Sequence, residues 1–394
     1  MIKLKGKKSL LALLGVLLML GVILVTSIPA LAAPVGILLK GSTTVYPIVN
    51  GSEIQFESDF PNIDLQYQGG GSGQGSVALF TEPAQCDIAM RSKVLESSYD
   101  INKVFETKIA WDGIAVIVND GLSAYIHGSV TSITKVELYN IYQGNDIVYW
   151  DSLSGYTGTH GSLYPIIPRA RITDSGTRSS FLSLIGSATE AGEELAVDAT
   201  GLNRLESNDT MASAIAGMVE SPAPTHEESQ IGYCGLGFLT TPGITTIPVQ
   251  NSSGTPIQCS QTTVGNGTYP LSRLLYLYTR HPDFDRTGGN TYKLEALDYV
   301  NWILSSEGQA IVVDEGYVKL PTNDAITAVT QTLYWDQNNN RACDIGDVVV
   351  VGRALGQSGW YPTNHKDANG NGAVDIGDVV VVGKRLGRSW IAPQ

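Results

Sequence analysis

The segment from Arg169 to Phe181, RARITDSGTRSSF, contains residue types that can bind an anion. It follows a short apolar run and opens a stretch with helical spacing. A Ser-Gly-Thr turn at a helix start points backbone N–H groups and hydroxyls toward one place, where the helix dipole favours negative charge. Arg171, four residues before Ser175, adds a forked guanidinium that suits a tetrahedral oxyanion. The same turn is also an ordinary helix cap, so the segment alone leaves both interpretations open.

Three earlier segments share one pattern, in which a strand-like run leads into a turn rich in hydrogen-bond donors. KGSTTVYP begins at Lys40, YQGGGSGQG at Tyr67 and DIAMRSK at Asp87. Glycine in such a turn lets an anion approach the backbone closely. A Gly-rich run is more often a flexible loop, but here it lies between strand and helix signals. The repeated pattern predicts a mainly parallel α/β sheet with a ligand at the strand ends.

Later patterns predict the elements that hold these turns in place. They are a buried strand over 108–118 with a turn inside it, helices over 133–142 and 208–219, strands over 230–237 and 269–278, and helices over 294–304 and 307–313. A chain that leaves one lobe and later returns to it forms two lobes with a cleft between them. That shape suits hinge closure on a small ligand.

Length and charge limit the possible partners. The chain has 394 residues, enough for two to three domains, and its net charge is −13. An acidic chain of this kind is a poor partner for nucleic acid. If it binds an anion, local dipoles and one or two placed cations must do so.

The first 32 residues are typical of a secretory signal peptide. Four lysines precede an apolar run from Leu10 to Val25, and Ala30-Leu31-Ala32 offers a cleavage site. The apolar run is long, so a retained membrane anchor stays an alternative. Either interpretation places the rest of the chain outside the cell, secreted or on the cell surface.

The cysteines give no metal signature. Cys86, Cys234, Cys259 and Cys343 show no C-x-x-C spacing. In an exported protein a Cys234–Cys259 bridge and four buried free thiols are both open interpretations.

The ordered motifs resemble a known family over roughly residues 36–321. KGSTTVYPI, YQGGGSGQG, DIAMRSK, IAWDGIAVIVN, RITDSGTR, QIGYCGLGFL, YPLSRLLYLYT, NWILSSEGQAIV and EGYVKLP occur here in the order found in the phosphate-binding proteins of phosphate ABC importers. The resemblance implies a two-lobed α/β fold of the periplasmic-binding-protein-like (type II) class with a hinge. It also implies a monomer that captures inorganic phosphate, catalyses no reaction and delivers its ligand to ABC permease subunits.

The resemblance also places the binding residues. The implied phosphate-binding set is Thr43, Thr44, Ser72, Ser92, Arg171, Ser175, Gly176 and Thr177. Better-known members carry an aspartate at the position of Ser92, where it accepts the proton that phosphate retains. A serine hydroxyl can donate or accept, which weakens discrimination by charge unless Asp174 or Asp87 replaces the missing acceptor. Sulfate, molybdate or tungstate therefore remains an alternative ligand.

Residues 329–394 contain a repeat with a period of 31 residues, from Asp336 to Asp367. Oxygen side chains at loop positions 1, 3, 5 and 12 are the spacing that binds calcium. The predicted ligands of two calcium ions are Asp336, Asn338, Asn340 and Asp347 in the first loop, and Asp367, Asn369, Asn371 and Asp378 in the second. Arg341 occupies the sharp turn that Gly372 makes in the second loop, so the first loop should bind calcium more weakly.

Each loop is followed by one helical run instead of being flanked by two, which resembles a dockerin (type I-like) over about residues 333–388. The resemblance implies a small all-α domain with two EF-hand-like loops, and a cohesin-bearing protein as partner. Ile345-Gly346 and Ile376-Gly377 replace a polar pair common in cellulosomal members, so the identity of the partner stays open.

Two other functional classes are alternatives. A structural or adhesive surface protein would keep the binding fold as a scaffold and use the C-terminal repeat. A phosphatase would need a base beside Ser175, and the five histidines lie outside the motifs. No enzymatic activity is therefore expected.

Overall fold

A computed structural model describes residues 33–121, 130–143, 148–158, 164–186, 193, 202–219, 229–281, 293–358, 366–369 and 371–393. The predicted signal segment 1–32 lies outside the described residues. The chain divides into a unit Met1–Val35 and a compact unit Gly36–Gln394, and the second is described below. Within the ranges given above, no helix is both long and apolar enough to cross a membrane.

An eight-stranded mixed sheet forms the centre of the unit, in the order β2-β1-β3-β10-β4-β6-β5 with β7 beside β4. The strands are β1 (Val35–Gly41), β2 (Ile63–Gln68), β3 (Ile88–Arg91), β4 (Val104–Asn119), β5 (Ile167–Pro168), β6 (Gln230–Gly235), β7 (Ile244–Ile247) and β10 (Ser272–Arg280), with a separate β8 (Val249–Gln250) and β9 (Pro256–Ile257) pair. The prediction of a mainly parallel sheet is wrong, because β10 is antiparallel to both β3 and β4, and β4 is antiparallel to β6.

Strand β4 is continuous, so the turn predicted inside it is also wrong. Its residues Trp111, Asp112 and Gly113 pair directly with Leu274, Arg273 and Ser272 of β10. The Trp-Asp-Gly sequence has the composition of a turn, but here its aspartate is buried against an arginine on the neighbouring strand.

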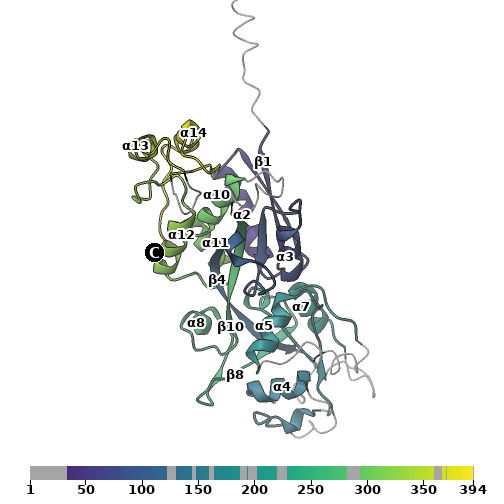
Figure 1. Cartoon of the computed structure of the whole chain (residues 1–394). Coiled ribbons are helices and arrows are strands. Elements are labelled where there is room, and N and C mark those ends of the chain that lie inside the picture. Colours follow the sequence, from purple (N-terminus) through teal and green to yellow (C-terminus); the bar gives the residue numbers. More distant parts are fainter. Residues whose placement is uncertain are drawn as a thin grey trace, which may run out of the picture. The chain divides into compact units, whose positions relative to one another are not determined.

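The two long strands β4 and β10 pass through two separate hydrophobic cores, which define two lobes. Lobe 1 surrounds the core that includes Ile109 and Leu275, and lobe 2 surrounds the core that includes Ile114 and Leu271. The strands cross from one core to the other near Asp112. Figure 1 shows α2, α10 and α11 toward one end of the β4–β10 ribbon and α4, α5 and α7 toward the other. The predicted two-lobed α/β fold is confirmed.

The helices lie close to the predicted positions. They are α2 (Tyr46–Asp59), α3 (Ser72–Phe80), α4 (Lys135–Gln143), α5 (Gly176–Leu184), α7 (Asn208–Ala216), α8 (Gln261–Gly265), α10 (Leu294–Ile303), α11 (Ser306–Asp314), α12 (Thr322–Thr332), α13 (Ile345–Arg353) and α14 (Ile376–Gly383). Helix α3 begins at Ser72, within the Gly-rich segment YQGGGSGQG. Helix α12 was not predicted, because its polar composition hides the apolar face.

The C-terminal segment packs against lobe 1. One helix follows each loop of the repeat, α13 after the first and α14 after the second, and the two helices contact each other. Val351, Val382 and Trp390 belong to the same hydrophobic cluster as the core of lobe 1. The segment therefore shares its buried surface with the larger fold.

All four cysteines are free and buried. Of the two interpretations left open, the structure has the thiols and not the Cys234–Cys259 bridge. Burial raises the pKa of each thiol, to about 12 for Cys86 and for Cys343.

Candidate functional site

The predicted binding residues of the two lobes meet at one place. The hydroxyl of Thr44, in the turn before α2, lies 2.8 Å from the hydroxyl of Thr177 in the first turn of α5. Ser72 begins α3, and its hydroxyl lies 3.3 Å from that of Ser92 at the end of β3. These contacts bring together the N-termini of three helices, where backbone N–H groups lack intrahelical acceptors.

Gly176 fits between the two lobes only because it has no side chain. A Cβ atom at this position would lie 2.1 Å from Ser72 Oγ and 2.5 Å from Ser92 Oγ. Ser175 caps the helix by accepting the N–H of Arg178 at 3.2 Å. Gly176 and Thr177 are the first two residues of α5, where backbone N–H groups lack intrahelical acceptors.

Arg171 is fully buried beside these turns, and hydrogen bonds to protein atoms orient its guanidinium. Within lobe 2, Nε donates to the Leu205 carbonyl, Nη1 to Asn208 Oδ1 at 2.8 Å and Nη2 to the Glu206 carbonyl at 2.7 Å. Across the cleft, Nη2 donates to the Thr43 hydroxyl at 3.1 Å. The guanidinium is thus held by lobe 2 and faces the first donor turn of lobe 1.

Burial, with a smaller contribution from the neighbouring charge of Arg273, lowers the pKa of Arg171 to about 10. The group is still protonated at neutral pH. A buried cation held below its ordinary pKa is stabilised by an incoming anion. The electrostatics of the site therefore favour a negatively charged ligand.

Arg273 is a second buried arginine at this site, and the sequence analysis missed it. It lies on β10 directly opposite Asp112 of β4, and its Nη2 is 2.7 Å from Asp112 Oδ2. Burial raises the pKa of Asp112, and the Arg273 charge opposes that shift. The available signal was a charged residue inside each of two apolar strand patterns, which is tolerated only when the two charges pair.

The two residues proposed to replace the missing acceptor lie in different places. Asp87 accepts from Leu38 N and from Lys293 Nζ, at 2.8 and 2.9 Å. It precedes Ser92 by five residues along β3, about 16 Å at the rise of an extended strand. Asp174 directly precedes Ser175, and its backbone carbonyl accepts the N–H of Gly73 at 3.2 Å. Asp87 is therefore not part of the site, and Asp174 borders it.

A cleft of about 560 Å³ adjoins the site between the lobes. Ser92 and Arg273 line it, together with Lys93, whose Nζ is 3.1 Å from the hydroxyl of Ser179 on α5. The cleft and the site therefore share Ser92 and Arg273 as part of their walls.

The two C-terminal loops have closely similar internal geometry. The first-position aspartates, Asp336 and Asp367, each accept two backbone N–H groups from their own loop. The twelfth-position aspartates, Asp347 and Asp378, are fully buried and accept backbone N–H groups from both ends of the loop. Arg341 has φ 67° and Gly372 has φ 90°, so the sharp turn needs the left-handed region in both loops.

Buried carboxylates in such a loop fit a cation. Among the ion pairs of the described residues, none joins Asp347 or Asp378 to a basic side chain. In the same described ranges, no three His, Cys, Asp or Glu side chains lie close enough together to hold a metal ion by themselves. Half of the predicted ligands in each loop are asparagines, so each predicted set contains only two carboxylates.

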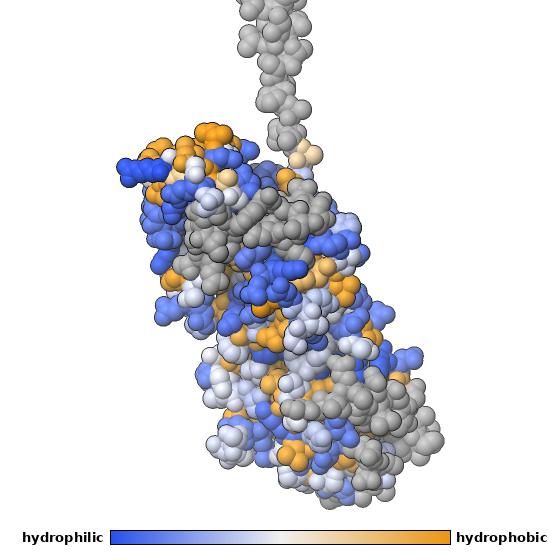
Figure 2. All heavy atoms as spheres, in the orientation of Figure 1, coloured by the Kyte–Doolittle hydropathy of each residue, from blue (hydrophilic) through white to orange (hydrophobic). Residues whose placement is uncertain are grey.

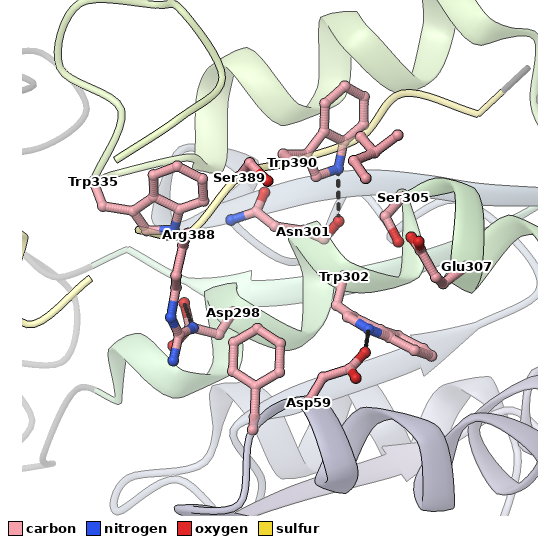
Figure 3. Close-up of a pocket in the computed structure, with 12 residues that line it drawn as sticks. Asp59, Asp298, Asn301, Trp302, Ser305, Glu307, Trp335, Arg388, Ser389 and Trp390 are labelled. Carbon is pink, nitrogen blue, oxygen red and sulfur yellow. Dashed lines mark hydrogen bonds and ion pairs between the residues drawn. The ribbon is translucent and has the colours of Figure 1, made fainter. Parts of the chain in front are cut away.

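A second cavity, of about 250 Å³, lies where the C-terminal segment meets lobe 1 (Figure 3). Its wall includes Trp302 from α10 and Trp390 from the C-terminus, whose indole donates to the Asn301 carbonyl at 2.9 Å. Asp298 is buried at one side and pairs with Arg385 at 2.9 Å. These contacts attach the C-terminal segment to α10.

The fold and the site define a two-lobed solute-binding protein. The chain matches the PBP superfamily domain over residues 29–307 and belongs to that superfamily. It is 24% identical over 305 residues to the phosphate-binding protein PstS of Pseudomonas aeruginosa, covering 74% of this chain and 85% of that protein. It is 26% identical over 282 residues to the phosphate-binding protein PstS of Bacillus subtilis, covering 71% of this chain and 79% of that protein.

Solved structures show the same fold. A putative phosphate ABC transporter substrate-binding protein from Clostridium perfringens, with bound phosphate, aligns with a TM-score of 0.56 at 22% identity, covering 73% of this chain and all of that one. An ABC-type phosphate transport receptor from Vibrio cholerae aligns with a TM-score of 0.50 at 23% identity, covering 72% of this chain and all of that one.

Proposed function

We propose that the chain captures inorganic phosphate outside the cell and delivers it to the permease of an ABC importer. The observation that supports this most strongly is the meeting of three helix N-termini with the buried Arg171 between the lobes. Four hydroxyls from the two lobes, those of Thr44, Thr177, Ser72 and Ser92, lie within 3.3 Å of a partner hydroxyl at the same place. This set offers many donors and one net positive charge, which matches a small tetrahedral oxyanion.

The names of the relatives favour phosphate over other oxyanions. The relatives reported above are phosphate-binding proteins, and the Clostridium structure holds phosphate. Ser92 can still accept the proton of a phosphate oxygen, because a hydroxyl has both functions. Sulfate is the alternative ligand to test, since it carries no proton near neutral pH and needs only hydrogen-bond donors from the protein.

Calorimetric titration of the full exported chain, freed of ligand by unfolding and refolding, tests the proposal. The whole chain is used because the C-terminal segment shares the core of lobe 1. Tight binding of phosphate with weaker sulfate is expected. Tighter sulfate or molybdate would change the ligand, and binding of none of them would leave a structural or adhesive role.

The C-terminal segment carries a second proposed role, as a calcium-dependent attachment module for a cohesin-bearing protein. Asp336, Asp347, Asp367 and Asp378, with the loop asparagines, would hold two calcium ions and so order both loops. Removal of calcium with a chelator should loosen α13 and α14, and it should be visible as lost helical circular dichroism and lower melting temperature. An unchanged melting temperature would reject calcium as a structural ion.

An exposed apolar face supports a protein partner for this segment. Repeat-related residues 31 positions apart are exposed on the two helices, including Ile345 at 68% and Ile376 at 69%. Val349 and Val380 continue the face one turn further on each helix. Figure 2 shows hydrophobic side chains gathered over this part of the molecule. A contiguous group of exposed apolar side chains is typical of a surface that binds another protein.

Replacing Ile345 and Ile376 with aspartate tests the proposed attachment. Binding to purified cohesin domains should be lost, while calcium-dependent stability and phosphate binding should stay unchanged. Retained cohesin binding would place the contact elsewhere.

A further inference from the structure

Arg273 lies where the two lobes join. It is the second residue of β10, between Leu271 of the lobe 2 core and Leu275 of the lobe 1 core. The side chain is 7% exposed. A buried charge at the crossing between two lobes is costly unless its hydrogen bonds are filled, so its partners show what it is for.

The guanidinium of Arg273 bonds to both lobes at once. On the lobe 1 side, Nη1 donates to the Ser92 carbonyl and Nη2 to the Thr44 hydroxyl, each at 3.2 Å. On the lobe 2 side, Nη1 donates to the Gly176 carbonyl at 3.2 Å and Nη2 to the Thr177 hydroxyl at 3.0 Å. Nη2 has two hydrogens, and one of them points to Asp112 Oδ2 together with the Nε hydrogen, so Thr44 and Thr177 share the other in a three-centre bond. All four partners belong to turns of the proposed oxyanion site. Separation of the lobes would break the contacts on one side.

The same bonds fix the direction of two hydroxyl protons. Arg171 can only donate, so Asn208 turns its Oδ1 toward Arg171 and its Nδ2 toward Thr44. Thr44 Oγ1 then accepts from Asn208 Nδ2 and from the Arg273 Nη2 hydrogen that it shares with Thr177, so both of its lone pairs are used. Its proton must be donated, and the Thr177 hydroxyl lies 2.8 Å away.

The Thr177 hydroxyl can then only donate a hydrogen bond to a ligand. It accepts from Thr44 and from the shared hydrogen of Arg273 Nη2, so its lone pairs are also used. Its proton is then free to be given to a ligand in the site. Two arginines, through Asn208 and Thr44, thus make the Thr177 hydroxyl an obligatory donor.

We propose that Arg273 is a positioning residue that holds the two lobes together and fixes the Thr177 hydroxyl as a hydrogen-bond donor to the bound oxyanion. The second half of this inference rests on the proposed function, whereas the first half does not. An obligatory donor pairs with an unprotonated oxygen and cannot accept the proton that phosphate retains. Acceptance of that proton is therefore left to the serine hydroxyls of Ser72 and Ser92.

The variant for the test is the double substitution Arg273→Met with Asp112→Asn. Replacing Arg273 alone would leave Asp112 buried without its cation and could unfold the protein. The double variant keeps the net charge, and the amide oxygen introduced by Asp112→Asn can still accept from Leu236 N. Arg280→Met is the matched control, because Arg280 lies on the same strand, is buried, and pairs with Glu82 away from the site.

A distance measurement tests the closure without ligand. Spin labels on Ile54→Cys in α2 and Val136→Cys in α4 report the separation of the lobes by electron–electron double resonance, since both positions are exposed and the native cysteines are buried. In the ligand-free full chain, the double variant should give a longer main distance than the wild type and the Arg280→Met control. Equal distances in all three would overturn the role in closure, whatever the chain binds.

Calorimetry with phosphate and sulfate tests the proton direction. In the double variant the Thr177 hydroxyl can rotate and accept, so sulfate affinity should fall several-fold more than phosphate affinity. A purely structural defect would lower both equally and would overturn the assignment. If sulfate does not bind the wild type, the pH profile of phosphate binding replaces it, with a flatter profile expected for the variant. If the wild type binds neither ion, the proposed function fails, and the distance measurement still decides on closure.

Discussion

Replacement of Arg171 by alanine is the sharpest test of the binding site. The guanidinium is buried, and four hydrogen bonds to protein atoms hold it against the donor turns. A hydrogen bond to a charged group contributes about 1.5–3 kcal/mol. Loss of one such bond to the ligand should therefore weaken phosphate binding by about tenfold to about 150-fold.

Isothermal titration of phosphate into the full exported chain measures this loss. Arg169→Ala is the matched control, because Arg169 is two residues away but donates to Gln230 and to the Asn203 carbonyl outside the site. The control should bind phosphate as the wild type does. Unchanged affinity in Arg171→Ala, with a melting temperature close to that of the wild type, would refute the assignment of the site.

The protonation of Arg171 gives the same assay a pH dependence. Its pKa is lowered to about 10, mainly by burial. Phosphate affinity should hold up to that pH and fall as the pH rises further, because the guanidinium loses its charge. Deprotonation of Arg171 has the opposite effect on the free energy of unfolding of the ligand-free protein, which it increases. The cost of the buried charge is present below about pH 10 and is relieved between that pH and the ordinary pKa of arginine.

Three further substitutions probe other parts of the structure. Gly176→Ala should abolish phosphate binding or reduce it more than a hundredfold in calorimetry, since its Cβ would lie 2.1 Å from Ser72 Oγ with the lobes closed. Asp298→Ala should lower the free energy of unfolding by about 3–5 kcal/mol in urea denaturation, because it leaves the buried Arg385 without its carboxylate. Arg341→Gly should tighten calcium binding by the first loop about fivefold in a calcium titration, because it removes about 1 kcal/mol of left-handed backbone strain.

Each of these substitutions has a control within the chain. Gly352→Ala places a methyl group where no atom lies within 4 Å, so it should leave phosphate binding unchanged. Asp59 is exposed and lines the same cavity as Asp298. Asp59→Asn should therefore change the free energy of unfolding by no more than about 0.5 kcal/mol. Gly372→Arg should weaken the second loop as Arg341→Gly strengthens the first. Equal calcium affinities of the wild type, Arg341→Gly and Gly372→Arg would show that the left-handed turn does not cause the difference in calcium affinity between the two loops.

The sequence predicted the parts of the fold that depend on local patterns. The small-residue turns before α2, α3 and α5 were recognisable because glycine, serine and threonine there serve both as helix starts and as donors. The structure brings these turns together across the lobes, as the resemblance implied for Thr44, Ser72 and Thr177. The binding role of each residue remains a prediction.

The errors concern pairing between distant segments. Neither the antiparallel placement of β10 nor the continuous β4 is encoded in a local pattern, since an apolar strand reads alike in either direction. The Asp112–Arg273 pair depends on that placement, so both residues were missed as parts of the site. Asp87 was a candidate acceptor by proximity in sequence to Ser92, and the direction of β3 removes it from the site.

The acidic chain reaches an anion site by pairing its own carboxylates away from the ligand. Asp112 is paired with Arg273, and the buried Glu193 of lobe 2 is paired with Arg178 and Arg204. The positive charge of Arg171 has no carboxylate among its hydrogen-bond acceptors, which are carbonyls, an amide and a hydroxyl. The net charge of −13 therefore does not oppose capture at the site, because the local charge there is positive. Selection among oxyanions must then depend on the hydroxyl protons, whose directions are set by two arginines, one held by lobe 2 and one on the strand that joins the lobes.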